Sequence, residues 1–425
     1  MKFSLPKPKP GKHAIIFLFI TILISMIGFG IIIPVMPDLI QQLTGEDISG
    51  AARYGSYLML VYAVMQFFMA PIIGGLSDRF GRRLVILTSL GAYAIDYTLM
   101  SLAPTYAWLI LGRAIAGACA ATYATSNAFI ADISPPEKRA ANFGLMGAAF
   151  GLGFIIGPLI GGWLGDINVR YPFYAAGGLA TINFIYGFFV LPETLPAEKH
   201  RKFDWRRANP LGSLFQVCKH PVIAIILVSY FMVMFAQNSF PAVWAYFAEE
   251  KFSWSASQIG YSLAFVGLLS ALVQGGLVRP LMPKLGEVRA ILLGASSMVL
   301  ALLGYALFTP SGNWVYLWII VGSVSAFTMP AMQAIMSRVT GPKAQGELQG
   351  AIASVMSLTL MSSPFIMTQL FAHYTDRAHD IVYFPGAPFL LAAMLVAVGL
   401  VPLILMLPRV QKAAPNAPTA EDVKL

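Results

Sequence analysis

Two charged residues lie inside apolar stretches of this sequence. Asp96 lies in an apolar run from 84 to 103, and Arg113 lies in the next run, which begins at 106. Both are seven residues from the connection between the runs, so as helical residues they would lie roughly 10 Å deep and could form an ion pair. An isolated charge at that depth is costly, and pairing or access to water is the usual answer. We therefore interpret Asp96 and Arg113 as proton-coupling residues beside a proton or substrate path, with a fixed ion pair between two helices as the alternative.

A second group of charges lies between the apolar runs 54–76 and 84–103. The segment from Gly74 to Arg83 reads Gly-Gly-Leu-Ser-Asp-Arg-Phe-Gly-Arg-Arg. Its glycines permit close backbone approach and left-handed dihedrals, and its charges favour a water interface. We expect a short charged turn that joins two adjacent antiparallel helices.

Uncharged polar and aromatic side chains in the apolar runs are candidate ligand contacts. Amides often simply join helices, whereas amides beside aromatic faces and a methionine wall would suit a bulky amphipathic ligand. Aromatic and methionine side chains at such spacings also occur in the ordinary packed core of proteins. The candidate substrate contacts are Gln66, Asn127, Gln237, Asn238, Phe240, Trp244, Gln274, Met332 and Gln333.

The composition places these residues in membrane helices. Of the 425 residues, 57% are hydrophobic and only 11% are charged, which is far outside the range of soluble globular domains. The sequence predicts an all-α integral membrane protein with twelve transmembrane helices. Its long apolar runs lie near 14–36, 54–76, 84–103, 106–131, 141–164, 171–191, 221–247, 256–281, 289–308, 313–337, 347–371 and 384–407.

The positive charges indicate the topology. With the N-terminus inside, the inner segments hold 23 of the 28 Lys and Arg residues, and the outer loops hold only Arg53, Arg170, Lys251 and Arg377. Both termini are therefore expected in the cytoplasm, and the net charge of +9 reflects topology rather than a nucleic-acid partner. We expect an N-terminal tail, a six-helix bundle, a cytoplasmic linker, a second six-helix bundle and a C-terminal tail, at 1–13, 14–191, 192–220, 221–407 and 408–425.

The two halves also resemble each other. The segment from Asn127 to Gly144 aligns without gaps with that from Gln333 to Gly350, and Arg79-Phe80-Gly81 aligns with Lys284-Leu285-Gly286 at nearly the same offset, close to 206 residues. This predicts two pseudo-symmetric bundles, with a substrate site near the membrane midplane that is reached alternately from each side.

The fifth apolar run is rich in glycine. Glycines at four-residue spacing form a smooth surface for helix packing, and Pro158 removes a backbone hydrogen bond. The density of Gly147, Gly151, Gly153, Gly157, Gly161 and Gly162 favours a pliable contact between the halves over a simple packing face.

These motifs resemble those of the major facilitator superfamily over nearly the whole chain. The loop pattern is Gly74-x-x-x-Asp78-Arg79-x-Gly81-x-Arg83, and Arg113-x-x-x-Gly117 resembles the fourth-helix arginine motif. Within the family, Ile95-Asp96-Tyr97, Leu111-Gly112-Arg113 and Lys284-Leu285-Gly286-Glu287 are most similar to bacterial tetracycline and drug:proton antiporters.

The resemblance implies a role for each motif. Arg113 would serve proton coupling, and Gly153, Gly157, Pro158, Gly161 and Gly162 would form the antiporter motif. Asp132 would join the loop residues in a conformational latch, formed by Gly74, Asp78, Arg79, Gly81, Arg82, Arg83 and Asp132. The chain departs from tetracycline exporters at Ser25, Ser270 and Met298, where they carry an aspartate, a histidine and an aspartate, which favours a related exporter of another substrate.

The sequence therefore favours a secondary active transporter that exports a small amphipathic or hydrophobic compound, drug-like or tetracycline-like, in exchange for protons. Uptake or facilitated passage of a metabolite on the same fold is the alternative, and a non-transporting membrane receptor is a third possibility. We expect a monomer in the bacterial inner membrane that has no enzymatic activity, cofactor or metal. Its partners would be protons, a small molecule and the lipid bilayer.

Overall fold

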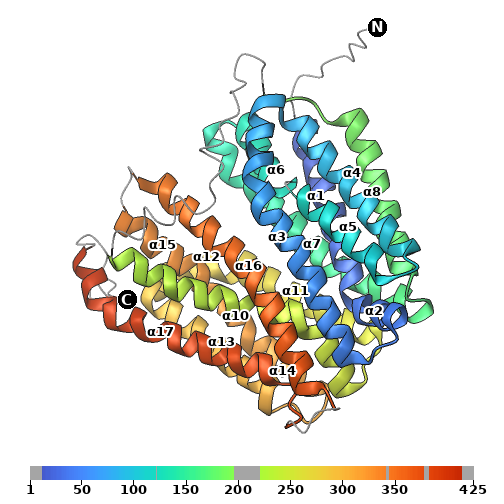
Figure 1. The fold of residues 1–425 in the computed structure, drawn as a ribbon. Helices are drawn as coiled ribbons and strands as arrows, with labels where there is room; N and C mark the ends of the chain where they lie inside the picture. Colours follow the sequence, from blue (N-terminus) through green and yellow to red (C-terminus); the bar gives the residue numbers. More distant parts are fainter. Residues whose placement is uncertain (1–11, 121, 196–220, 341–343, 378–381, 414–425) are drawn as a thin grey trace. The chain divides into compact units, whose positions relative to one another are not determined.

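The computed structural model describes residues 12–120, 122–195, 221–340, 344–377 and 382–413, which form helices joined by short connections (Figure 1). Eleven spans in this described part are long and apolar enough to cross a membrane, and a shorter apolar helix covers Tyr106–Ala118. These twelve segments match the twelve predicted runs one to one, which confirms the all-α membrane prediction. The predicted tails and most of the predicted linker lie outside the described residues.

The chain divides into two compact units. The first comprises Met1–Asp47, Tyr57–Asn209 and Trp254–Gly267, and the second comprises Ile48–Ser56, Pro210–Ser253 and Leu268–Leu425. The first turns of the second membrane helix, within Ile48–Ser56, therefore belong to the second unit. The start of the eighth membrane helix, within Trp254–Gly267, belongs to the first unit.

The first unit is built around two helices, α1 and α4. Helix α1 packs against α7 and α8, and α4 packs against α8 and α5. The helices are α1 (Lys12–Ile32), η1 (Ile33–Val35), α2 (Met36–Thr44), α3 (Ile48–Phe80), α4 (Arg82–Leu102), α5 (Tyr106–Ala118), α6 (Thr122–Ile133), α7 (Pro136–Ile167), α8 (Tyr171–Val190) and the first part of α11 (Ala256–Leu272).

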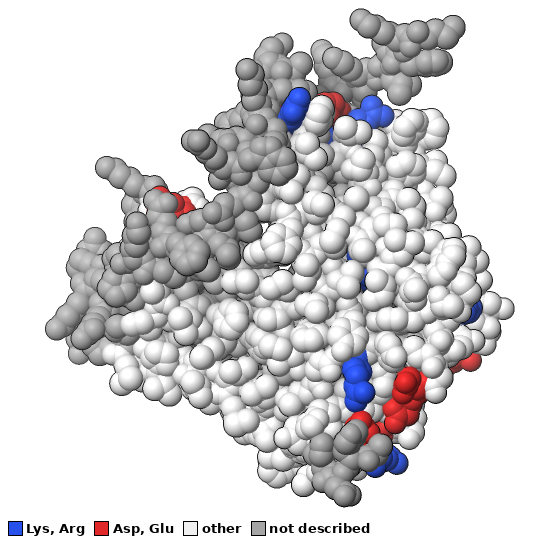
Figure 2. All heavy atoms as spheres, in the orientation of Figure 1, with Lys and Arg blue, Asp and Glu red and all other residues white. Residues whose placement is uncertain are grey.

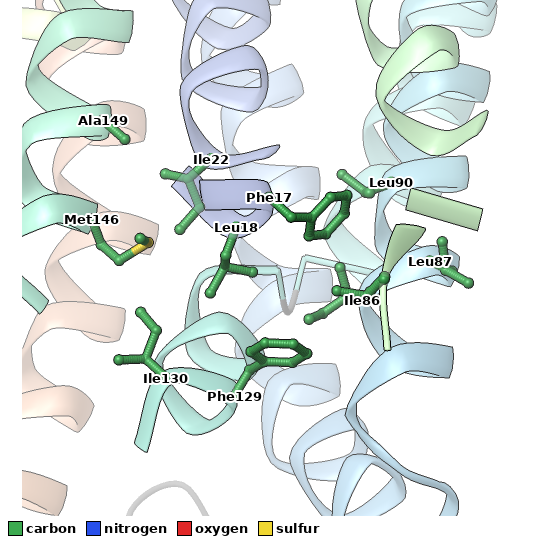
Figure 3. Packing of buried hydrophobic residues seen from close by; sticks show 11 residues of the cluster. Phe17, Leu18, Ile22, Ile86, Leu87, Leu90, Phe129, Ile130, Met146 and Ala149 are labelled. Carbon is green, nitrogen blue, oxygen red and sulfur yellow. The ribbon is translucent and has the colours of Figure 1, made fainter. Parts of the chain in front are cut away.

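A buried apolar cluster joins four of these helices. Figure 3 shows Phe17 and Leu18 of α1 between Ile86 and Leu90 of α4 and Phe129 of α6. All five side chains are at most 1% exposed. Because α4 and α6 share this core, Arg82 at the start of α4 and Asp132 near the end of α6 are held in fixed relative positions.

The second unit repeats this plan around α10 (Pro221–Phe252) and α13 (Glu287–Leu307). Helix α10 packs against α16 and α17, and α13 packs against α17, α14 and α15. The other elements are η4 (Val273–Leu277), α12 (Val278–Leu285), α14 (Asn313–Ser323), η5 (Val324–Phe327), α15 (Thr328–Thr340), α16 (Gln345–Thr375) and α17 (Ala387–Ala413).

The predicted charged turn is shorter than its sequence suggests. Helix α3 continues through Phe80, so Gly74, Asp78 and Arg79 are helical and only Gly81 separates α3 from α4. Gly81 has φ 100° and ψ 159°, a conformation essentially restricted to glycine, and this one residue reverses the chain. Beyond this connection, α4 packs chiefly against α8 and α5.

The internal repeat is visible in the backbone of both units. The fourth membrane segment was predicted as one helix, but it is interrupted between Ala118 and Thr122, and the tenth is interrupted by η5 at Val324–Phe327. These interruptions lie 206 residues apart, which is the offset of the sequence repeat. Gly286 also has a positive φ, 71°, directly before α13, as Gly81 has before α4.

Large apolar side chains cover much of the surface. Phe189, Leu405 and Ile167 are at least 70% exposed, and Figure 2 shows broad uncharged areas between small groups of acids and bases. Such exposure is unfavourable in water and suits a lipid environment.

Candidate functional site

Asp96 of α4 and Arg113 of α5 form a buried ion pair. The Arg113 guanidinium donates from Nη2 to Asp96 Oδ2 and from Nε to Oδ1, the latter at 3.2 Å. The Asp96 side chain is fully buried, and that of Arg113 is 11% exposed. The ion pair that we expected from the similar depths of Asp96 and Arg113 is therefore confirmed. Its two-point geometry is the strong form of an arginine–carboxylate contact.

Tyrosines surround the guanidinium. The Arg113 Cζ atom lies 5.6 Å from the ring centre of Tyr62 on α3 and 5.9 Å from that of Tyr97 on α4. The Tyr62 hydroxyl lies 3.2 Å from the Tyr93 hydroxyl. Sequence reasoning missed Tyr62 and Tyr93, and it quoted Tyr97 only as part of the Ile95-Asp96-Tyr97 motif. The spacing of Tyr93 and Tyr97 by four residues, beside Asp96, was the available signal.

Gly112 allows α4 and α5 to approach at this pair. A Cβ atom at Gly112 would lie 2.6 Å from Asp96 Oδ1 and 3.3 Å from the Asp96 carbonyl oxygen. Gly117, one turn and a half further along α5, faces the backbone of α3 at Tyr62. The pair is thus enclosed by three closely packed helices, and the carboxylate cannot lose its charge without leaving a buried guanidinium without its counter-ion.

A second charged group, here called the Arg82 cluster, consists of Arg82, Ser77, Asp78 and Asp132. Arg82 Nη1 donates to Asp78 Oδ1 at 2.6 Å and to Ser77 Oγ at 3.0 Å, and Arg82 Nε donates to Asp132 Oδ2 at 3.2 Å. The cluster therefore connects the end of α3, the start of α4 and the end of α6.

Arg83 and Arg79 have other contacts. Arg83 Nη2 donates to the carbonyl oxygen of Phe188 at 2.7 Å, and Arg79 lies over the Phe80 ring. Of the two arginines that follow Gly81, Arg82 is the one whose side chain contacts Asp78 and Asp132.

Glu193, which sequence reasoning missed, caps the start of α4. Its carboxylate accepts the backbone N–H groups of Arg82 at 2.9 Å and Arg83 at 3.2 Å. An anion at a helix N-terminus is favourable because free N–H groups point at it. A lone acid directly after a membrane helix, before a basic segment, was the only sequence signal.

The second unit contains a counterpart with the charges exchanged. Glu287 at the start of α13 pairs with Arg338 near the end of α15. The internal repeat aligns Glu287 with Arg82 and Arg338 with Asp132. The base and the acid have therefore changed places between the two copies.

The glycines of α7 face two different helices. A Cβ at Gly153 would lie 2.5 Å from Met26 Cβ, and one at Gly157 would lie 2.8 Å from Gly30 Cα, so these glycines and Gly161 pack against α1 in the same half of the sequence. Gly162 instead faces Ala256 and Ser257 of α11, and Pro158 faces Gly260. Pro158 and Gly162 therefore contact a helix from the other half of the sequence, which is the contact that the glycine density favoured. Gly153, Gly157 and Gly161 form a packing face within their own half.

The predicted substrate contacts of the first unit are Gln66 and Asn127, both half-buried. The Gln66 Oε1 atom is buried and has no hydrogen-bond partner within the part of the chain that the structure describes. Buried polar atoms usually have a hydrogen-bond partner, and Gln66 stays a predicted substrate contact.

The predicted contacts of the second unit differ in accessibility. Trp244 is fully buried and stacks on half-buried Phe240 with ring centres 4.5 Å apart, beside Tyr305 and Phe389. Met332 is also fully buried, and Gln333 Nε2 donates to the Tyr230 hydroxyl at 3.0 Å. Gln237 and Gln274 are exposed, and Asn238 is half-buried. Trp244 and Met332 therefore belong to the packed core, while Gln237 and Gln274 remain accessible.

This arrangement defines a class: a multi-pass helical membrane protein with a buried charge pair and an internal duplication, the organisation of a secondary transporter. The family model of the Major Facilitator Superfamily matches residues 18–364. The chain belongs to the major facilitator superfamily.

Among similar proteins, the chain is 37% identical to the class C tetracycline resistance protein of Escherichia coli, over 90% of this chain and 96% of that protein. It is 28% identical to multidrug resistance protein 2 of Bacillus subtilis (strain 168), over 92% and 94%. The fold is similar to that of the nucleoside transporter NupG, with a TM-score of 0.72 at 12% identity, covering 93% of this chain and 99% of that one. The chain is therefore a membrane transporter and not an enzyme.

Proposed function

We propose that this protein exports a small amphipathic or hydrophobic compound across the bacterial inner membrane in exchange for protons. The observation that carries the proposal is the fully buried Asp96, whose charge is balanced by Arg113 inside the membrane. A buried ion pair is costly and adds little stability, so a reversible protonation is a better reason for its presence. The tetracycline resistance relatives support drug-like, tetracycline-like compounds as the first substrates to test.

In this proposal Asp96 takes up and releases the proton, and Arg113 stabilises the deprotonated carboxylate. The Arg82 cluster, with Gly74, Arg79, Gly81 and Arg83, stabilises a state closed to the cytoplasm, where both termini lie. The substrate contacts come from the accessible members of the predicted set, Gln66, Asn127, Gln237, Asn238 and Gln274. Each chain acts as a monomer and binds no nucleic acid.

Purified protein in liposomes that contain a pH-sensitive dye tests the proposal. With an imposed proton gradient, tetracycline should cause proton movement opposite to its own, and Asp96→Asn should abolish that movement. Asp47→Asn, an exposed aspartate outside the site, is the matched control and should behave as the unmodified protein.

Three results would count against the proposal. Failure of a panel of tetracyclines and other amphipathic drugs to move protons, with no effect of Asp96→Asn, would exclude antiport. Drug movement without protons would indicate facilitated passage. Drug and proton movement in the same direction would indicate uptake.

A further inference from the structure

We infer that the rings of Tyr62 and Tyr97 hold the Arg113 guanidinium in place while Asp96 is protonated. Tyr62 and Tyr97 are thus positioning residues for proton coupling. The inference rests on the proposed function, in which Asp96 is the proton-binding group.

The geometry of the site supplies the first argument. The guanidinium lies within about 6 Å of two ring centres, the range in which a cation is attracted to an aromatic face. The two rings come from different helices, Tyr62 from α3 and Tyr97 from α4, and Arg113 comes from α5. The remaining side-chain contact of its Nη2 atom is the Met100 sulfur at 3.5 Å, which is a weak acceptor.

The change of charge during coupling supplies the second argument. When the Asp96 carboxylate binds a proton, one O–H bond forms and the carboxyl becomes neutral, while the guanidinium stays charged. A buried cation without a counter-ion is strongly unfavourable. The tyrosine rings stay neutral at physiological pH. Their attraction for the guanidinium is stronger once Asp96 is neutral, because the carboxylate no longer competes with the rings for the cation.

Tyr93 contacts both of the other tyrosines. Its hydroxyl lies 3.2 Å from that of Tyr62, and its ring stacks on Tyr97 with a centre distance of 6.3 Å and an angle of 20°. The three tyrosines therefore form one frame around the guanidinium.

In the described part of the chain, no other titratable group holds the Arg113 guanidinium in place of the tyrosines. Helix α3 presents Tyr62, α4 presents Asp96, Tyr93 and Tyr97, and α5 presents Arg113 itself. Helices α2, α6 and α8 also pack against α4 or α5, but no described acid or base from them forms an ion pair or hydrogen bond with Asp96 or Arg113.

Protonation of Asp96 can be measured without any substrate, by infrared difference spectra of the purified protein in lipid nanodiscs as the pH is changed. The band that Asp96→Asn removes reports this carboxyl. Tyr62→Leu and Tyr97→Leu should each move its titration midpoint to lower pH by roughly one unit, a tenfold loss of proton affinity, because the protonated state has lost a partner for Arg113. Tyr62→Phe and Tyr97→Phe keep the ring and should stay near the original midpoint.

Tyr174→Leu, an exposed tyrosine on α8, is the control and should leave the midpoint unchanged. If Tyr62→Leu does not fold, Tyr62→Met replaces it, since it also removes the ring. An unchanged midpoint in the Leu variants would overturn the inference, as would equal shifts in the Leu and Phe variants, which would assign the effect to the hydroxyls. If those results accompany loss of proton movement in Asp96→Asn, the proposed function still stands. If no band depends on Asp96, both fail.

Discussion

Gly112 touches Asp96 so closely that a side chain at position 112 cannot be accommodated without moving the carboxylate, since its Cβ would lie 2.6 Å from Oδ1. We predict that Gly112→Ala forces α4 and α5 apart and misaligns the ion pair with Arg113. The protein should lose about 1–3 kcal/mol of stability, as overpacked sites do, and proton-coupled transport should fall at least tenfold.

Chemical unfolding in detergent and the liposome assay measure the two effects. Gly178→Ala on α8 is the matched control, because its Cβ would meet no atom within 4 Å. Retention of stability and coupling in Gly112→Ala would show that the close approach of α4 to α5 is not required.

The two glycines that precede α4 and α13 should differ in their tolerance of alanine. Gly81 has φ 100° and Gly286 has φ 71°, so alanine at either position is strained, by about 1–2 kcal/mol. Gly81→Ala should cost more than Gly286→Ala, because its Cβ would collide with the Glu193 carboxylate, whereas that of Gly286 meets nothing within 4 Å.

A double-mutant cycle of Gly81→Ala with Glu193→Ala, followed by unfolding, isolates that contact. The combined variant should lose less stability than the sum of the single changes. Strict additivity, or equal costs at positions 81 and 286, would contradict this account.

The two exchanged ion pairs should respond differently to charge reversal. Reversing both members of the Glu287–Arg338 pair should restore the stability that either single reversal removes, about 1 kcal/mol or less, because the pair is partly exposed. Reversing Arg82 and Asp132 together should restore only part of the loss, because Arg82 also binds Asp78 and Ser77. Thermal unfolding of the four single and two double variants measures this, and equal recovery in both pairs would be inconsistent with the Arg82 cluster.

Trp244 should matter for folding rather than for substrate binding. It is fully buried and stacked on Phe240, so Trp244→Ala should cost about 3–5 kcal/mol and leave the affinity of the folded fraction for tetracycline unchanged. Gln237→Ala, at an exposed position, should weaken binding without loss of stability. Equilibrium binding and unfolding, measured on the same preparations, separate these effects. If Trp244→Ala weakened binding without loss of stability, Trp244 would belong to the substrate site.

Properties that depend on local sequence were predictable. Hydropathy located all twelve membrane segments, because crossing the bilayer requires long apolar runs whatever their partners. The Asp96–Arg113 pair followed from equal depth on consecutive helices. The repeat offset near 206 residues aligned Gly81 with Gly286, and both glycines have a positive φ directly before a helix.

Properties that depend on tertiary packing were not predictable. The partners of the α7 glycines depend on which helix lies against which face. Glu193 acts through a connection that returns to the start of α4, and the role of Tyr62 depends on α3 lying beside α5. The extent of α3 was misjudged because glycines and charges near a helix end indicate a turn by composition, although they remain compatible with helical geometry through Phe80.

The single-residue connection at Gly81 has a mechanical consequence. Helix α3 has 33 residues, a length of roughly 50 Å, and contains Pro71. Because Gly81 alone separates α3 from α4, the last turn of α3 is held close to the first turn of α4, which Glu193 caps. The end of α3 and the start of α4 are therefore constrained to move together.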